Sequence, residues 1–284
     1  MGNKKPVLLA VLAHPDDESF GMGGTLALYA ARGVDVNLIC ATRGEAGEMS
    51  TDYMEGYSSI GERREAELRC AAGILGIKEI YFLGYRDSGM QGSPDNKHPR
   101  ALAIQPVDEV AAKIVHHIRK IKPDIVLTFD PIGGYRHPDH IAIHKATVCA
   151  FEKSDDPSFG VDVLEGYQAK KLYYHIIPRN FIRFFIKVLP LFGKDPHRWG
   201  SNRDIDITLL AGEEYPINAI IDIRSVIRKK NQAGACHASQ GGGQMSMGIM
   251  SWIMRITGGK ETFMRAFPPV QAGEKVEKDL LTGI

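Results

Sequence analysis

The stretch VLLAVLAHPDDE, residues 7–18, decides the fold of this 284-residue chain. Its first part, residues 7–13, is an unbroken apolar run, which is typical of a strand buried on both faces of a parallel sheet. A helical pattern follows over residues 25–31 and ends at Gly33. Strand, loop and helix in this order form the first half of a βαβ unit, so these residues predict an α/β protein.

The same alternation continues through the first half of the chain. Further strands are expected at residues 34–41, 79–83 and 124–129, and helices at residues 60–75, 106–121 and 139–151. Successive strands joined by helices have right-handed crossovers and lie parallel in one sheet. The expected fold class is therefore α/β, a Rossmann-like three-layer α/β/α architecture with a mostly parallel sheet and a C-terminal elaboration.

The second half of the chain has a less regular pattern. A strand is expected at residues 171–177, and a strand at 219–223 precedes a helix at 225–238. A chain of this length can bury one large core, so we expect a single domain over residues 1–284. Its expected parts are a core of about 5–152 and 217–240, an insertion of about 153–216, and a tail of 241–284.

The overall charge indicates a small or neutral substrate. Lys and Arg number 35 and Asp and Glu number 34, which gives a net charge of +1. This balance does not favour a polyanion partner. We therefore expect a small-molecule partner and no nucleic acid.

The four cysteines are far apart and include no CxxC pair, so buried free thiols are expected at these positions: Cys40, Cys70, Cys149 and Cys236.

The apolar runs predict a soluble, cytoplasmic protein. The run that begins at Pro6 stops after eight residues at His-Pro-Asp-Asp-Glu, where a signal peptide would have small residues. The apolar segment at residues 181–192 is interrupted by Arg183, Lys187 and Pro190 and is too short to span a membrane. The same segment is a candidate subunit contact, so a homo-oligomer is one possible state of the protein.

Two loops after expected strands carry unusual sets of polar side chains. The first, at residues 14–18, reads HPDDE, and the second, at residues 130–140, ends in HPDH. Ligands of parallel α/β sheets bind beyond the carboxyl ends of the strands. Adjacent acids at a sheet end repel one another unless a positive charge lies among them, and a divalent cation provides that charge. We expect His14, Asp17 and His140 to bind one metal ion.

Two histidines and one carboxylate are the ligand set of a hydrolytic zinc site that keeps a position for water. Zinc lowers the pKa of that water to about 7, and Asp16 is placed to accept its proton. We expect His137 to donate to the oxygen that becomes negative in the tetrahedral intermediate. Asp139 is expected to orient His137 and hold it protonated, and Tyr135 is a candidate second donor. The ligand set also suits Fe²⁺, so the physiological metal stays open.

Together these motifs resemble those of the PIG-L/LmbE family of zinc-dependent de-N-acetylases. The resemblance rests on AHPDDE at residues 13–18, Gly23-Gly24 and the distant HPDH, and it runs from Val7 to about Gln240. Weaker parts of the match are TRGE at 42–45, RREAEL at 63–68 and HASQ at 237–240. The resemblance implies zinc on the three expected ligands, Asp16 as general base and His137 as electrostatic stabiliser or acid.

The resemblance also implies a substrate and residues that bind it. Arg64 corresponds to the family arginine that contacts the polar head of the substrate, and Arg63 is its rival. Glu45 and His237 are further candidates for substrate binding, although packing of a C-terminal helix explains His237 equally well. The GGYRHPDH loop is similar to that of mycothiol-pathway members, which implies de-N-acetylation of an N-acetylglucosamine-containing conjugate. The insertion and the tail are where its aglycone would be selected.

Three other functions compete with this interpretation. An amidase that removes a larger acyl group, such as a mycothiol S-conjugate amidase, would use the same zinc water. A non-catalytic, metal-containing sugar-binding protein would not require Asp16 and His137. A dinucleotide-dependent oxidoreductase is suggested by the glycines at residues 21–24, but Leu26 replaces the third small residue of its motif and the second strand lacks a ribose-binding acid.

Overall fold

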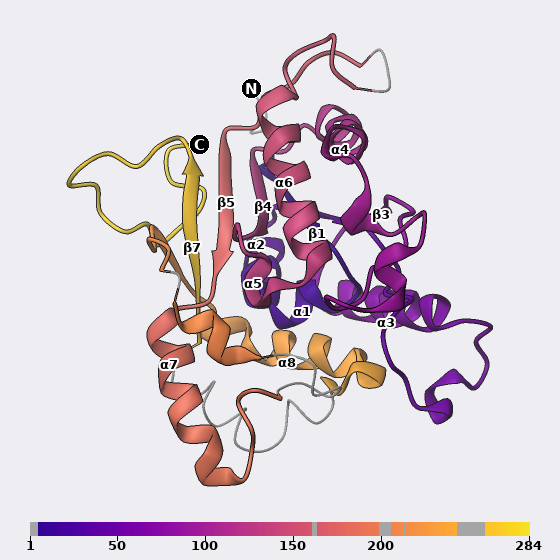
Figure 1. The fold of residues 1–284 in the computed structure, drawn as a ribbon. Helices are drawn as coiled ribbons and strands as arrows, with labels where there is room; N and C mark the ends of the chain where they lie inside the picture. The colour runs from indigo at the N-terminus through magenta and orange to yellow at the C-terminus, as the bar shows by residue number, and fades with distance from the viewer. Residues whose placement is uncertain (1–4, 161–163, 199–205, 213, 243–258) are drawn as a thin grey trace.

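One seven-stranded sheet organises the chain, in the order β3-β2-β1-β4-β5-β7-β6 (Figure 1). The computed structural model describes residues 5–160, 164–198, 206–212, 214–242 and 259–284. Its strands are β1 Val7–Leu12, β2 Asp35–Cys40, β3 Glu79–Phe82, β4 Ile125–Phe129, β5 Lys171–Ile176, β6 Ala219–Asp222 and β7 Lys260–Phe267. Strands β1 to β5 pair in parallel, and β7 is antiparallel to both β5 and β6. The predicted α/β fold class with a mostly parallel sheet is confirmed.

Helices cover both faces of this sheet. In the described part of the chain they are α1 Asp17–Phe20, α2 Gly23–Ala31, α3 Ile60–Leu75, α4 Val107–Ile121, α5 Gly133–Arg136, α6 Pro138–Lys153, α7 Arg179–Val188 and α8 Ile227–Cys236. Helices α4 and α6 pack together on one face, whereas α2, α3 and α8 pack together on the other (Figure 1). This arrangement gives the predicted three layers.

Strand β1 is central because all of its residues are apolar. Leu8 and Leu9 are fully buried, and Leu8 pairs with Val36 of β2 on one side and Ile125 of β4 on the other. Burying a leucine side chain contributes about 1.5–3 kcal/mol. The HPDDE loop therefore begins at a strand that is fixed on both sides.

Helix α3 begins and ends where the sequence predicts. Ser59 accepts a hydrogen bond from the Glu62 backbone N–H at 3.2 Å, which satisfies a free donor of the first turn. Gly76 ends the helix with φ of +79°, a conformation that favours glycine. These local signals explain why the bounds of α3 were readable from sequence.

The predicted division of the second half needs correction. The expected strand at 171–177 forms as β5, but it pairs with β4 inside the sheet, so the supposed insertion contains a core element. The supposed tail contributes β7, which lies between β5 and β6. Its sequence pattern is misleading because Glu261 and Arg265 are buried charges. Glu261 pairs with Lys230 at 2.5 Å, and the Arg265 guanidinium contacts two glutamates of the C-terminal segment, Glu274 and Glu277.

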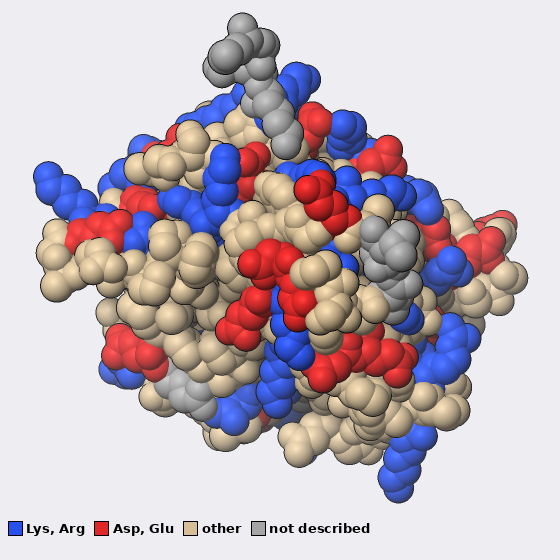
Figure 2. Space-filling model, turned by 90° about the horizontal axis from the view of Figure 1, so that it is seen from above, with Lys and Arg blue, Asp and Glu red and all other residues tan. Residues whose placement is uncertain are grey.

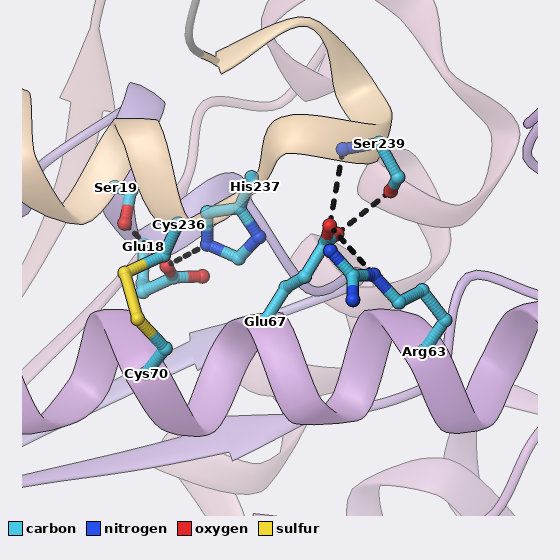
Figure 3. The surroundings of a disulfide bond; sticks show 8 residues. All are labelled: Glu18, Ser19, Arg63, Glu67, Cys70, Cys236, His237 and Ser239. Atoms are coloured by element: carbon cyan, nitrogen blue, oxygen red, sulfur yellow. Dashed lines mark hydrogen bonds and ion pairs between the residues drawn. A yellow bond between two sulfur atoms is a disulfide. The ribbon is translucent and has the colours of Figure 1, made fainter. Parts of the chain in front are cut away.

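The expectation of four free thiols is also wrong. Cys70 of α3 and Cys236 of α8 form a disulfide, with their Cα atoms 6.0 Å apart (Figure 3). Their separation of 166 residues carries no signal in the sequence, because the packing of α3 on α8 brings them together. Cys40 is a buried free thiol, as expected, whereas Cys149 is free but only partly buried.

The apolar segment 181–192 forms most of α7 and the following 3-10 helix Leu189–Phe192. A second small core joins it to the 3-10 helix Ile207–Ala211 through these buried side chains: Ile182, Phe185, Leu189, Ile207 and Leu210. Tyr135 packs against this core, so the segment supports the loop that precedes α6. None of the described helices is long and apolar enough to cross a bilayer. A role in a homo-oligomer stays a prediction.

The charges on one face of the molecule are mixed. Figure 2 shows Lys and Arg side chains interspersed with Asp and Glu over the face seen from above, rather than gathered into one basic area. This face lies at the end of the molecule from which β5 runs downward in Figure 1. It lies opposite the carboxyl ends of the parallel strands, where the polar loops lie.

Candidate active site

The polar loops gather at the carboxyl ends of β1 and β4. These strands are neighbours, and the direction of the chain order reverses between them, since β2 and β3 follow on one side and β5 on the other. A crevice forms at such a switch point. The loop after β1 supplies His14 and Asp17, and the loop after β4 leads to His137 and His140. The structure therefore brings the two predicted groups together.

The side chains of the three predicted metal ligands face one another. His14 Nδ1 lies 3.2 Å from His140 Nε2, and Asp17 Oδ1 lies 3.2 Å from the same His140 atom. Asp17 Oδ2 lies 3.7 Å from His14 Nδ1. Ligand atoms at about 2.0–2.1 Å from a tetrahedral zinc ion are spaced by about 3.3–3.4 Å. The three groups therefore fit a single ion of that size.

Both histidine rings are oriented by a second contact. His140 Nδ1 faces the carbonyl oxygen of Gly133 at 3.1 Å, which leaves Nε2 toward the shared centre. His14 Nε2 faces the carboxylates of Asp139 at 3.1 Å and Asp87 at 3.4 Å, which leaves Nδ1 toward the centre. Partners of this kind fix the tautomer and orientation of metal-binding histidines.

The Asp17 carboxylate is held in its ionised form. Its Oδ2 accepts the backbone N–H groups of His14 at 2.7 Å and Ala13 at 3.2 Å. Burial alone would raise the pKa of Asp17, but His140, His14 and these hydrogen bonds bring that pKa below its usual value. A carboxylate that is already deprotonated is ready to bind a cation.

His137 lies beside the same centre as a neutral ring. Its ring and those of His14 and His140 offer nitrogens within 4.8 Å of one another. Burial, followed by the charges of these two rings, lowers the pKa of His137 well below its usual value. Its Nδ1 accepts the backbone N–H of Asp139 at 3.1 Å, so the proton of the neutral ring lies on Nε2. His137 is therefore a hydrogen-bond donor through Nε2.

The role expected for the Asp139 carboxylate is wrong. It contacts His14 and accepts hydrogen bonds from the backbone N–H and hydroxyl of Ser88, rather than holding His137 protonated. The Tyr135 ring lies beside two of these histidines, with its centre 4.9 Å from that of His140 and 5.9 Å from that of His137, and its role as a second donor stays a prediction. Burial and nearby carboxylates raise the pKa of Tyr135 well above its usual value, so its hydroxyl keeps its proton.

Asp16 has an unusual backbone and a buried partner. Its φ is +126°, a region that non-glycine residues rarely adopt. Its Oδ2 accepts a hydrogen bond from Arg64 Nη2 at 2.9 Å, and its backbone N–H donates to Glu18 Oε2 at 3.0 Å. Burial raises the pKa of Asp16 to about 6, although the Arg64 charge opposes this rise. A carboxylate with this pKa suits a general base near neutral pH.

Arg64 is packed behind Asp16 and not open to a substrate. Its side chain is buried, and besides Asp16 it donates to the carbonyl oxygens of Pro15 at 2.8 Å and Gly44 at 2.9 Å. A Cβ at Gly44, which has φ of +69°, would lie 2.1 Å from Arg64 Nη1, so a side chain at this position would displace the guanidinium. The expected substrate contact of Arg64 is corrected to an internal contact with the candidate base.

The other expected substrate residues have different surroundings. Arg63 is partly exposed, and it donates to Glu67 at 3.1 Å and lies over the ring of Tyr57. Glu45 accepts the backbone N–H of Asp87 at 3.1 Å, which ties the loops after β2 and β3 together. For Arg63 and Glu45, substrate binding stays a prediction.

His237 is fully buried, so the expectation that it lines the substrate pocket is corrected. Its Nε2 lies 2.7 Å from Glu18 Oε1, directly behind the HPDDE loop (Figure 3). It reaches this position at the end of α8, and Figure 3 shows it next to the disulfide.

Sequence reasoning missed Asp87, Ser88 and Glu18. Asp87 and Ser88 follow β3, so the rule that placed the other loops beyond strand ends could have found them. Nearby His14 and His137 lower the pKa of Asp87 below its usual value despite burial, which alone would raise it. Glu18 belongs to the quoted HPDDE stretch, but its partner His237 is 219 residues away and gives no local signal.

Known proteins are similar to this chain in sequence and in fold. A family model described as PIG-L, GlcNAc-PI de-N-acetylase, matches residues 9–151. A 1D-myo-inositol 2-acetamido-2-deoxy-alpha-D-glucopyranoside deacetylase of Geodermatophilus obscurus is 37% identical over 242 residues and covers 82% of each chain. A protein of the same name from Acidothermus cellulolyticus is 35% identical over 298 residues, covering 98% of this chain and 94% of its own.

A solved structure agrees at the level of the fold. It is N,N'-diacetylchitobiose deacetylase from Pyrococcus horikoshii, with a TM-score of 0.61, 23% identity and coverage of 92% of this chain and 84% of that one. The family match and the two relatives go further and confirm the predicted class of enzyme, a deacetylase that hydrolyses an amide bond. This chain belongs to the PIG-L family of de-N-acetylases.

Proposed function

We propose that this chain removes the acetyl group from the 2-acetamido nitrogen of an N-acetylglucosaminyl conjugate whose aglycone is inositol. The curated relatives that cover 82–98% of the chain carry the name of that activity. The observation that carries the proposal is the convergence of His14, Asp17 and His140 on one point, with Asp16 next to them.

The same donor set supports zinc as the metal. Two imidazole nitrogens and one carboxylate suit a catalytic zinc site, and Fe²⁺ is the alternative with the same ligands. Bound zinc would polarise the amide carbonyl and lower the pKa of a water molecule. His14, Asp17 and His140 would hold it, because their contacts to Asp139, Gly133 and the backbone leave these donor atoms directed at one point.

Asp16 has the role of general base in this proposal. Its carboxylate accepts a proton from the attacking water and then gives that proton to the departing amine nitrogen. Arg64 keeps the carboxylate in place through the hydrogen bond at 2.9 Å. The raised pKa of Asp16, about 6, lets it act in both directions near neutral pH.

Two donors serve the carbonyl oxygen. His137 Nε2–H and the Tyr135 hydroxyl both remain protonated, because the contacts of the neutral ring place its proton on Nε2 and burial raises the pKa of the phenol. Hydrogen bonds to an oxygen that becomes negative are worth roughly 10²–10³ in rate for each donor. For the polar head of the substrate we propose Arg63, which is partly exposed, in place of the buried Arg64.

The test is release of acetate and free amine from a panel of conjugates with inositol, malate, phospholipid and chito-oligomer aglycones. Metal-replete protein is compared with Asp16→Ala. The expected result is release from the inositol conjugate that disappears in the variant. A panel without any acetate release, for protein that contains its metal, contradicts the proposal.

A second candidate is an amidase that removes a larger acyl group. The geometry around His14 and Asp16 suits any amide carbonyl, so a cysteinyl amide of the glucosaminyl conjugate belongs in the same panel. Faster release of cysteine derivatives than of acetate would favour this candidate.

The proposed location of the protein is the cytoplasm. Because disulfides are rare in that compartment, the redox state of Cys70 and Cys236 in cells tests it.

A further inference from the structure

The Glu18 carboxylate holds the backbone of the candidate base. It is fully buried, and its Oε2 accepts the Asp16 N–H at 3.0 Å. Asp16 has φ of +126°, which most side chains avoid, so something outside the residue must stabilise this conformation. The hydrogen bond from its own N–H to Glu18 acts directly on the peptide unit that sets this angle.

Glu18 is in turn held by His237. The other carboxylate oxygen, Oε1, lies 2.7 Å from His237 Nε2, and both side chains are completely buried (Figure 3). Within the described residues His237 Nδ1 has no hydrogen-bond partner, so Glu18 provides the hydrogen bond that orients the ring, and Phe20 packs edge-on against the ring at 5.8 Å. Replacing a buried polar pair by apolar side chains of similar volume often leaves stability unchanged or increases it. Stability alone therefore does not explain why Glu18 and His237 are polar.

His237 is anchored to α3 on both sides in the sequence. The residue before it, Cys236, is bonded to Cys70 of α3. Two residues after it, the Ser239 backbone N–H and hydroxyl donate to the Glu67 carboxylate of α3 at 3.0 and 2.7 Å (Figure 3). The same helix carries Arg64, which binds the Asp16 carboxylate. Helix α3 thus reaches the side chain of Asp16 directly and its backbone through His237 and Glu18.

We propose that Glu18 and His237 are positioning residues that keep Asp16 in the conformation in which it accepts a proton. This inference rests on the proposed role of Asp16 as general base. Both side chains are completely buried, and the hydrogen bonds described above run to Asp16 and between these two residues rather than to His14, Asp17 or His140. Their effect should therefore fall on turnover rather than on the binding of substrate or metal.

The first test compares Glu18→Leu with Glu18→Gln. Leucine fills the space without accepting the Asp16 N–H, and a misplaced base lowers kcat by about 10²-fold. Glutamine keeps an oxygen for that N–H, and its amide can face His237 after the ring proton moves to Nδ1, so kcat is expected within about fivefold of wild type. For both variants KM and the zinc dissociation constant should stay within about twofold.

The second test changes the other member of the pair and does not depend on folding of the leucine variant. His237→Ala should lower kcat about tenfold, and His237→Gln, which retains a donor for Glu18 Oε1, should restore most of that loss. Amide hydrogen exchange of the peptide that contains Asp16 should accelerate in His237→Ala and not in His237→Gln. This second readout is independent of activity.

The outcomes separate this inference from the proposed function. Wild-type kcat in Glu18→Leu and His237→Ala, with Asp16→Ala inactive, overturns the positioning role and leaves the base in place. Weakened zinc binding in parallel with the loss of kcat also overturns it, because Glu18 would then act through its neighbour Asp17. An active Asp16→Ala contradicts the proposed function itself.

Discussion

The two sides of Asp16 differ in how clearly the sequence marks their residues. On the metal side, His14 and Asp17 are three residues apart, and His140 follows the neighbouring strand β4. On the other side, Glu18 contacts His237 across 219 residues of sequence. The proposed metal ligands therefore belong to two motifs that are each local in the sequence, and the pairing of β1 with β4 brings these motifs together across 126 residues. The proposed base is instead held by the packing of α3 against α8, which no local motif indicates.

The largest expected effect on activity comes from removing one of the proposed metal ligands. His140→Ala removes one of three ligands, so zinc content should fall far below one per chain and acetate release should drop by roughly 10³-fold or more. Metal analysis beside the activity assay measures both. His144→Asn on the same helix is the control, since His144 contacts the Phe129 carbonyl oxygen at 2.8 Å and should keep the metal.

A smaller effect on activity is expected when Asp139, which contacts the proposed ligand His14, is changed. Asp139→Asn weakens the contact to His14 Nε2, and such changes lower metal affinity about 10–100-fold. Excess zinc should therefore restore most of the activity. If excess zinc leaves the activity low, the loss in Asp139→Asn does not come from weakened metal binding through His14.

The position of the proposed base, Asp16, can be changed without changing any proposed metal ligand. Gly44→Ala places a Cβ 2.1 Å from Arg64 Nη1, so Arg64 must move away from Asp16 and turnover should fall by about 10²-fold with zinc retained. Gly56→Ala is the matched control, because Gly56 also has a positive φ but has no atom within 4 Å of the added Cβ. Equal losses in both variants would attribute the effect to backbone strain instead.

The smallest effect on activity is expected at the disulfide. Cys70→Ser opens the link between α3 and α8, which should lower the free energy of unfolding by about 2–4 kcal/mol. The Ser239–Glu67 contact remains, so kcat should change by less than about threefold. Denaturant unfolding and steady-state kinetics check the two parts. A loss of kcat that matches His237→Ala would give the disulfide a larger share in positioning.

How much the sequence could predict follows the same division. Continuous apolar runs and caps such as Ser59 and Gly76 made strands and helices predictable, and HPDDE and HPDH identified the three residues that lie together at the candidate metal site. Strand β7 was missed because its buried charges, Glu261 and Arg265, have partners that only the folded chain provides. The pairing of Glu18 with His237 and the disulfide were missed for the same reason.

The most direct test of the central claim compares Asp16→Asn with Asp17→Asn for zinc content and acetate release. We expect Asp16→Asn to retain one zinc per chain and to lose about 10²–10⁴ in kcat, whereas Asp17→Asn loses both zinc and activity. An Asp16→Asn protein that turns over at the wild-type rate, or that no longer binds zinc, would contradict the separation of base from ligand on which the account rests.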